Sequence, residues 1–136
     1  MKTITKEFKF EASHQLGIKG CTQEENEQIF GKCANLHGHT YKIFITITSV
    51  QESNGMILNY SILKDIFNEN VYNIFDHHHI NDLPCMKGKL TTAENIIDVI
   101  WNLLTVNIRK VGCQLEEIKL YETATSCCTL TREKND

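Results

Sequence analysis

Residues 37–50, HGHTYKIFITITSV, carry the clearest strand pattern in the chain. Large apolar residues alternate with threonine or lysine along most of this stretch, from Tyr41 to Ile47. Successive side chains of a β-strand point to opposite faces, so a period of two predicts a strand with one buried face. His37 and His39 fall on that same face, which indicates that both imidazoles point to one side of a sheet.

The rest of the chain supplies partners for this strand. Further strands are predicted at residues 3–12, 56–60, 115–122 and 127–132. Helices are predicted at residues 61–74, where apolar residues recur at helical spacing, and from about residue 91 onward. Thr91-Thr92-Ala93-Glu94 fits a capping box at the start of the second helix, with Glu94 as its N3 member.

This order of elements predicts an α+β domain, with helices packed on one face of an antiparallel sheet. The polar residues 17–32 are expected to form a loop with one helical turn. The chain has 136 residues and shows no repeats or linkers, so we expect a single domain over residues 1–136.

Composition excludes several classes of partner. A net charge of −3 gives no reason to expect nucleic acid or an anionic membrane. The N-terminal MKTITKEFKF lacks the apolar core of a signal peptide, and no apolar run is long enough to span a membrane. The six cysteines contain no C-x-x-C pair and are expected to be thiols, not disulfides or a four-cysteine zinc site. We therefore expect a cytoplasmic protein.

Three histidines form a candidate metal site. His37 and His39 share a strand face, and His14 ends the preceding strand in phase with Phe8 and Phe10. If the two strands pair, His14 lies across from the other two. Three histidines with an open fourth position are typical of catalytic zinc, whereas structural zinc usually has four protein ligands. Each histidine considered alone also fits an ordinary strand or core histidine.

Other residues could carry proton transfer or ligand binding. Cys33, close to His37, fits a thiolate base, and it also fits a small buried side chain. Asp76-His77 fits a pair in which the carboxylate orients the imidazole, although the run of histidines through His79 also fits a second metal site or a solvated loop. Glu122 ends a predicted strand, where it could accept two parallel hydrogen bonds from an N–H/NH2 edge or simply be exposed.

Together these segments resemble a known family. FEASHQL, FGKCANLHGHTY, GMILNYSILK, DHHHIND, TTAEN and YETATSC occur in the order found in 6-pyruvoyl-tetrahydropterin synthases and bacterial 6-carboxytetrahydropterin synthases. The resemblance implies the tunnelling fold, a four-stranded antiparallel sheet with two helices on one face. It also implies homo-oligomers, trimers that stack into hexamers, with active sites between subunits.

The resemblance further implies roles for individual residues. It assigns one zinc ion per subunit to His14, His37 and His39. Cys33 matches the catalytic thiol, and Asp76 with His77 matches the pair that works with it in proton transfer. Glu122 matches the carboxylate that anchors the pterin, while Thr92 and Glu94 match a segment that lines the pterin pocket, expected from a neighbouring subunit.

The spacing around Cys33 bears on the branch of the family. Three residues separate Cys33 from His37, which is similar to the 6-carboxytetrahydropterin synthases of the queuosine pathway, whereas animal pyruvoyl synthases have a longer spacer. The expected reaction converts 7,8-dihydroneopterin triphosphate to 6-carboxytetrahydropterin, acetaldehyde and triphosphate. Two alternatives stay open: a 6-pyruvoyl-tetrahydropterin synthase with the same site, and a catalytically silent pterin- or zinc-binding protein.

Overall fold

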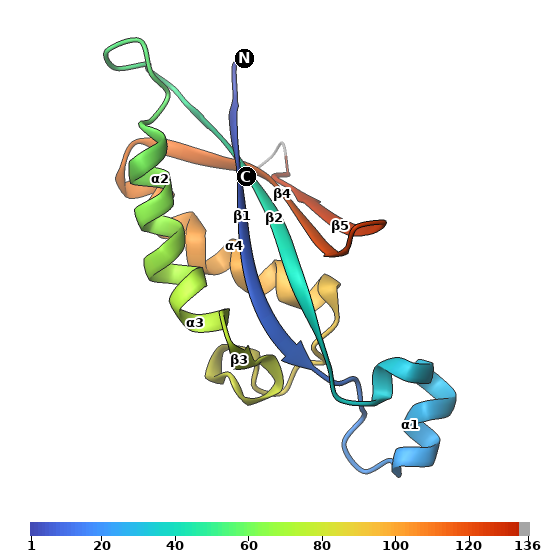
Figure 1. Ribbon diagram of the computed structural model, residues 1–136. Helices are drawn as coiled ribbons and strands as arrows, with labels where there is room; N and C mark the ends of the chain where they lie inside the picture. The colour runs from blue at the N-terminus through green and yellow to red at the C-terminus, as the bar shows by residue number, and fades with distance from the viewer. Residues whose placement is uncertain (134–136) are drawn as a thin grey trace.

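A single twisted sheet forms one layer of the protein (Figure 1). The computed structural model describes residues 1–133. The strand order in the sheet is β3-β1-β2-β4-β5. The strands are β1 (Ile4–His14), β2 (His37–Ser49), β3 (His78–His79), β4 (Cys113–Thr123) and β5 (Ser126–Thr131). All neighbouring strands are antiparallel except the short β3, which runs parallel to β1.

In β2, the alternation of apolar and polar residues buries one face of the strand, as predicted. Tyr41, Ile43, Ile45 and Ile47 are fully buried, while the residues between them are mostly exposed or half-buried. In β1 the same alternation buries Phe8 and Phe10. One face of the sheet is therefore apolar and the other polar.

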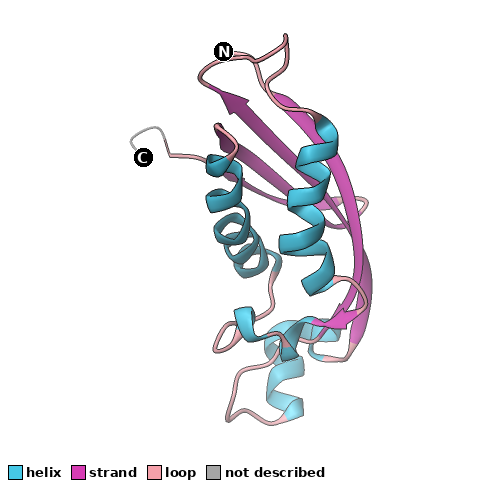
Figure 2. Cartoon of the chain, turned by 90° about the vertical axis from the view of Figure 1, so that its left-hand side faces the viewer, coloured by secondary structure: helices cyan, strands magenta, loops and turns pink. Residues whose placement is uncertain are grey.

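Helices cover the apolar face of the sheet (Figure 2). One helical rod begins with α2 (Tyr60–Phe67), continues through a π turn (Asn68–Tyr72) and ends with α3 (Asn73–Phe75). The second is the long α4 (Ala93–Lys110). Fully buried side chains from both rods contact the apolar face of the sheet and complete one core; among them are Leu63, Phe67, Val71, Phe75, Ile96, Ile100, Leu104 and Ile108.

A small helical excursion joins β1 to β2 at one end of the sheet (Figure 1). Helix α1 (Gln23–Phe30) is followed by a 3-10 turn (Gly31–Ala34). Thr22 and Glu25 form a reciprocal capping box at its start. The region predicted as a loop with one helical turn therefore contains a two-turn helix, because the box satisfies two of its free backbone N–H groups.

Three sequence predictions about local structure need correction. The sheet has a fifth strand, β3, because the histidine loop bends back beside the end of β1. Residues 56–60 form no strand beyond a single bridge between Ser53 and Met56, and Asn59 instead caps α2. The N-cap of α4 is Thr92, so its N3 residue is Asn95 and Glu94 is not the capping partner.

Two short 3-10 turns, Ile80–Asp82 and Pro84–Met86, complete the connection from β3 to α4. The remaining predicted elements are observed with slightly different ends. Within residues 1–133, no helix is both long and apolar enough to cross a membrane.

Candidate functional site

The pairing of β1 with β2 brings the three predicted histidine ligands together. His14 lies directly opposite His37, and Ala12 lies opposite His39. All three histidines point to the helix-covered face, in line with the buried Tyr41. Their ring centroids are 4.5 to 5.2 Å apart. The group therefore sits where the apolar layer ends.

Backbone carbonyls fix the orientation of two of the rings. His14 Nδ1 donates to the Thr91 carbonyl oxygen at 2.7 Å, and His37 Nδ1 donates to the Asn35 carbonyl oxygen at 2.7 Å. A carbonyl can only accept, so Nδ1 carries the proton in each ring and Nε2 presents a lone pair. Histidine metal ligands commonly have such a hydrogen bond on the other ring nitrogen.

The Nε2 atoms of all three histidines are buried and form no hydrogen bond within residues 1–133. Burial lowers the pKa of His14 and of His39, which favours the neutral imidazole. Buried polar atoms in proteins almost always have a partner, and three converging unpaired nitrogens could find one in a metal ion. Neutral imidazoles with free lone pairs are the form that binds a divalent metal.

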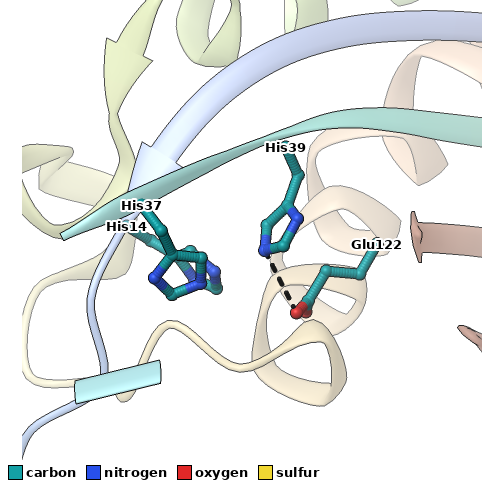
Figure 3. Close-up of side chains that lie close together, drawn as sticks. All are labelled: His14, His37, His39 and Glu122. Atoms are coloured by element: carbon teal, nitrogen blue, oxygen red, sulfur yellow. Dashed lines mark ion pairs between the residues drawn. The ribbon is translucent and has the colours of Figure 1, made fainter. Parts of the chain in front are cut away.

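Glu122 completes the group from β4 (Figure 3). Its Oε1 atom is 3.3 Å from His39 Nε2, although the geometry does not make this contact a hydrogen bond. One ligand atom from each of the four residues, His14, His37, His39 and Glu122, lies within 4.8 Å of the others. The arrangement fits a metal ion held by nitrogen and oxygen atoms. The nearness of Glu122 to the histidines was not predicted, because the β2–β4 register carries no local sequence signal.

Glu122 also lines a pocket beside the histidine group. The pocket has a volume of about 500 Å³ and is lined by Glu94 from α4 and by residues of the β4–β5 hairpin, including Cys127 and Cys128. That volume is within the range of small-molecule sites. Glu94 and Glu122 of one chain therefore share this pocket, whereas Thr92 contributes the N-cap hydrogen bond of α4.

Asp76 and His77 form a tight pair on the other face of the sheet. His77 Nδ1 donates to Asp76 Oδ2 at 2.7 Å, and Asp76 Oδ1 accepts the Glu11 backbone N–H at 2.9 Å. The Glu11 side chain is on the polar face, and its Oε2 atom is 3.8 Å from His77 Nε2. Within one chain, the pair and the three histidines thus lie on opposite sides of the sheet.

The pKa shifts of Asp76 and His77 agree with their hydrogen bonds. Hydrogen bonding to Asp76 raises the pKa of His77, and the Glu11 backbone hydrogen bond is the main reason that the pKa of Asp76 is lowered. The His77 backbone has a φ of 56°, a left-handed conformation that residues other than glycine rarely adopt. Its N–H donates to the Glu11 carbonyl, which holds this conformation in place. The contacts of Glu11 with Asp76 and His77 were not predicted, because only the pairing of strands brings these residues together.

His77 lines a second hollow, on the polar face, together with Glu11. It has a volume of about 510 Å³ and is also lined by Thr40, His78 and His79. His79 contacts the Ser13 hydroxyl through Nδ1 at 3.0 Å. Within the described residues, no further group of histidine, cysteine, aspartate or glutamate has metal-site geometry, so the structure gives no support to a second metal site in this loop.

Cys33 lies in the 3-10 turn just before β2. Its side chain is half-buried, and its carbonyl accepts the Leu16 N–H at 2.8 Å, which ties the turn to the end of β1. Among residues 1–133, the thiol forms no hydrogen bond with the histidine group or with the Asp76–His77 pair.

Comparison with known proteins identifies the family. The family model described as 6-pyruvoyl tetrahydropterin synthase matches residues 3–133. The chain is 38% identical over 122 residues to a 6-pyruvoyl tetrahydrobiopterin synthase of Dictyostelium discoideum, covering 88% of each chain. It is 36% identical over 132 residues to a 6-carboxy-5,6,7,8-tetrahydropterin synthase of Synechocystis, covering 93% of this chain and 90% of the relative. The chain therefore belongs to the 6-pyruvoyl tetrahydropterin synthase family.

Solved structures confirm the predicted fold. The 6-pyruvoyl tetrahydropterin synthase of Caenorhabditis elegans has a TM-score of 0.85 and 25% identity, covering 97% of this chain and 96% of its own. The Plasmodium falciparum enzyme of the same name shares the fold, with a TM-score of 0.66 at 18% identity. The tunnelling fold is thus shared, and the two-residue β3 is an addition to the four predicted strands.

Proposed function

We propose that this chain is a zinc-dependent lyase that acts on 7,8-dihydroneopterin triphosphate. The observation that carries the proposal is the group of three buried, unpaired histidine nitrogens with Glu122 at the edge of a ligand-sized pocket. Family membership supplies the substrate class, because the relatives are named for pterin products.

His14, His37 and His39 would hold the zinc ion. When bound, zinc supplies Lewis-acid chemistry that lowers the pKa of coordinated hydroxyl groups. The carbonyl hydrogen bonds on His14 and His37 keep their rings oriented for this task.

Glu122 would anchor the pterin ring. Its carboxylate can accept two parallel hydrogen bonds from the 2-amino-pyrimidinone edge of the ring. The same carboxylate lies beside the histidines, so a ring held by Glu122 has its side chain close to the metal site. Glu94 would line the pocket on the α4 side, and Thr92 would support it by fixing the first turn of that helix.

Cys33, Asp76 and His77 would move protons. Cys33 as thiolate would take a proton at the substrate side-chain carbon, and His77 would act as its acid–base partner with Asp76 orienting the ring. Because the pair lies on the far side of the sheet from the histidines, we propose that a neighbouring subunit provides it. A trimer, or a hexamer made of two trimers, supplies such neighbours.

The proposed products are 6-carboxytetrahydropterin, acetaldehyde and triphosphate. The three-residue spacer between Cys33 and His37 favours this outcome. A 6-pyruvoyl product is the second candidate, since relatives with that name reach 38% identity. The two reactions differ in the fate of the substrate side-chain carbons.

Product analysis by mass spectrometry tests the proposal. The zinc-loaded protein is incubated with 7,8-dihydroneopterin triphosphate, and we expect acetaldehyde and a carboxypterin. A pyruvoylpterin without acetaldehyde would move the chain to the other branch. Stoichiometric zinc without turnover of the substrate would contradict the enzyme assignment and leave a binding protein.

A further inference from the structure

A small cavity lies between α4 and the strands β4 and β5, at the opposite end of β4 from Glu122. Its volume is about 30 Å³. A buried water needs roughly 10–15 Å³, so the cavity has room for a species of about that size, and phosphate or sulfate is too large for it. The residues that line it are Trp101, Thr105, Arg109, Gln114, Leu115 and Arg132.

Helix α4 supplies a hydroxyl that has no partner. Trp101, Thr105 and Arg109 follow one another at intervals of four residues, so they lie on one face of the helix. The Oγ1 atom of Thr105 is buried and forms no hydrogen bond within residues 1–133. Buried polar atoms almost always have a partner, so this hydroxyl is available to whatever the cavity holds.

Arg132 lines the cavity from the end of β5, and contacts with β4 hold it in place. Its backbone N–H donates to the Glu116 carbonyl at 2.9 Å, and its Nε donates to Glu116 Oε1 at 3.3 Å. The Arg132 side chain is 24% exposed. A guanidinium has five N–H donors and this ion pair uses the one on Nε, so the terminal N–H groups remain available.

The lining of the cavity is positively charged. The chain contains two arginines, Arg109 and Arg132, and both line this cavity, whereas no lining residue is acidic. Glu116 balances Arg132, and Arg109 forms no ion pair among residues 1–133. One positive charge is therefore left beside the Thr105 hydroxyl and the Gln114 amide. Such a set of donors suits an anion, because hydrogen bonds to a charged acceptor are stronger than those to a neutral one.

We propose that this cavity binds one small monatomic anion, such as chloride, between Arg109, Arg132 and the Thr105 hydroxyl. Guanidinium groups are weakly hydrated and hold their donors in a fixed geometry, so they lose little when an anion replaces water. The anion joins α4 to the residue that follows β5 and stabilises this end of the domain. This site is separate from the proposed pterin chemistry and does not depend on it.

Thermal unfolding in potassium chloride and in potassium gluconate of equal concentration tests this proposal. Gluconate gives the same ionic strength but is too large for the cavity, so the comparison removes general screening by salt. At a chloride concentration about ten times its Kd, we expect the Tm to be about 5 °C higher than in gluconate. The same Tm in both salts throughout a titration would overturn the proposal.

Two variants assign the effect to the cavity. Arg109→Gln should remove most of the Tm difference between the two salts. Lys110→Gln is the matched control and should keep it, because Lys110 carries the same charge in the last turn of α4 but does not line the cavity. Both cations interact favourably with the carbonyl end of the helix, so that contribution is lost in each variant. An undiminished salt difference in Arg109→Gln would contradict the proposed site.

Diffraction locates the ion without relying on stability. In crystals soaked in bromide, we expect an anomalous peak within hydrogen-bond distance of Thr105 Oγ1 and the Arg132 guanidinium. A water molecule in the cavity without any bromide peak would show that water alone satisfies the Thr105 hydroxyl, and the proposal would fail.

Discussion

The imidazoles of His14 and His37 are oriented by the backbone before any ion binds. Each Nδ1 atom donates to a carbonyl, from Thr91 and from Asn35, and this leaves both Nε2 atoms directed at one point. Such preorganisation reduces the entropy that ion binding would otherwise lose. A bound ion would offset the cost of three buried nitrogens that have no partner among the described residues.

Zinc should therefore stabilise the protein. At a free zinc concentration about 1,000 times Kd, linkage gives about 4 kcal/mol, seen as a rise in Tm over the chelator-treated protein. His37→Ala should abolish most of this rise, and the exposed His78→Ala should keep it. Calorimetry with a zinc assay measures both, and a full zinc-dependent rise in His37→Ala would exclude the proposed ligand set.

Cys33→Ala should separate chemistry from binding. We expect turnover to fall at least about 100-fold, the usual worth of a general base, with zinc content and pterin affinity retained. Cys21→Ala, which removes another half-buried thiol, is the control and should keep full activity. Near wild-type turnover in Cys33→Ala would show that another group takes the proton.

The Asp76–His77 pair should depend on pH in a defined direction. Since folding raises the pKa of His77 above 6.5, its contribution to stability is complete below that value and is lost as pH rises through the raised one. Since the pKa of Asp76 is lowered from 3.8, its contribution is present above that value and is lost as pH falls through the lowered one. The pair is thus strongest in mildly acidic solution.

An NMR titration of His77 measures this coupling. Asp76→Asn should lower the titration midpoint of His77 toward 6.5, whereas Asp82→Asn, which changes an exposed carboxylate six residues further along, should leave it unchanged. A midpoint that is the same in wild type and Asp76→Asn would show that the carboxylate does not tune this histidine.

Among the elements, the α2–α3 rod shows what a periodic pattern can and cannot reveal. Leu63, Phe67 and Val71 recur at helical spacing and predict a helix at residues 61–74, close to the observed limits. The π turn at Asn68–Tyr72 was not predicted. A π turn adds about one residue to a helical turn, and the spacing of the apolar residues across it still resembles that of an α-helix. Asn70 Nδ2 donates to the Ile66 carbonyl at 2.8 Å and so satisfies backbone within this segment.

The strands follow the same logic. The strands β1, β2 and β4 each have several buried residues and were predictable from their alternation of apolar and polar residues. The two-residue β3 is too short for any period. It exists because the His77 N–H donates to the Glu11 carbonyl and the Asp76 carboxylate accepts the Glu11 N–H. Residues 56–60 were predicted as a strand from their apolar character, yet Ile57 and Leu58 pack on the core without pairing.

The first turn of α4 allows a test of two roles for one residue. Thr92→Ala should cost about 1 kcal/mol in unfolding free energy, because Asn95 N–H loses its side-chain acceptor, whereas Thr92→Asn should keep the cap. Urea unfolding measures the loss, and Thr22→Ala at the α1 cap is the comparison. If Thr92→Asn is as unstable as Thr92→Ala, the cap is not the reason. Weak pterin binding in a stable Thr92→Asn would show a separate pocket role.

For the molecule as a whole, the candidate site is divided between the two faces of the sheet. The face on which the three histidines lie could be predicted from the alternation of side chains along a strand. The side on which Asp76 and His77 lie could not, because a loop has no such alternation. Under the proposed function, a second subunit would bring Asp76 and His77 to each histidine group.

Mixed oligomers test this division. Cys33→Ala and His77→Ala homo-oligomers should both be inactive. Unfolding them together and refolding should restore about a quarter of wild-type activity, since random neighbours then pair one intact Cys33 with one intact His77 in that share of sites. Separately refolded variants, mixed afterwards, are the control. No recovery in co-refolded oligomers would indicate that one chain supplies both residues.

Because His14 faces His37 in the alignment of β1 with β2, a bound ion would favour this strand register over its alternatives. A shift of the strand register by one residue would turn His14 to the polar face and separate the three histidines. Only the native alignment would therefore gain the free energy of ion binding. The segment that connects the two strands then does not have to determine their register. Because loop closure costs little more as a loop lengthens, this connection is free to vary in evolution. An insertion that shifts this register within either strand would, by contrast, separate the three histidines.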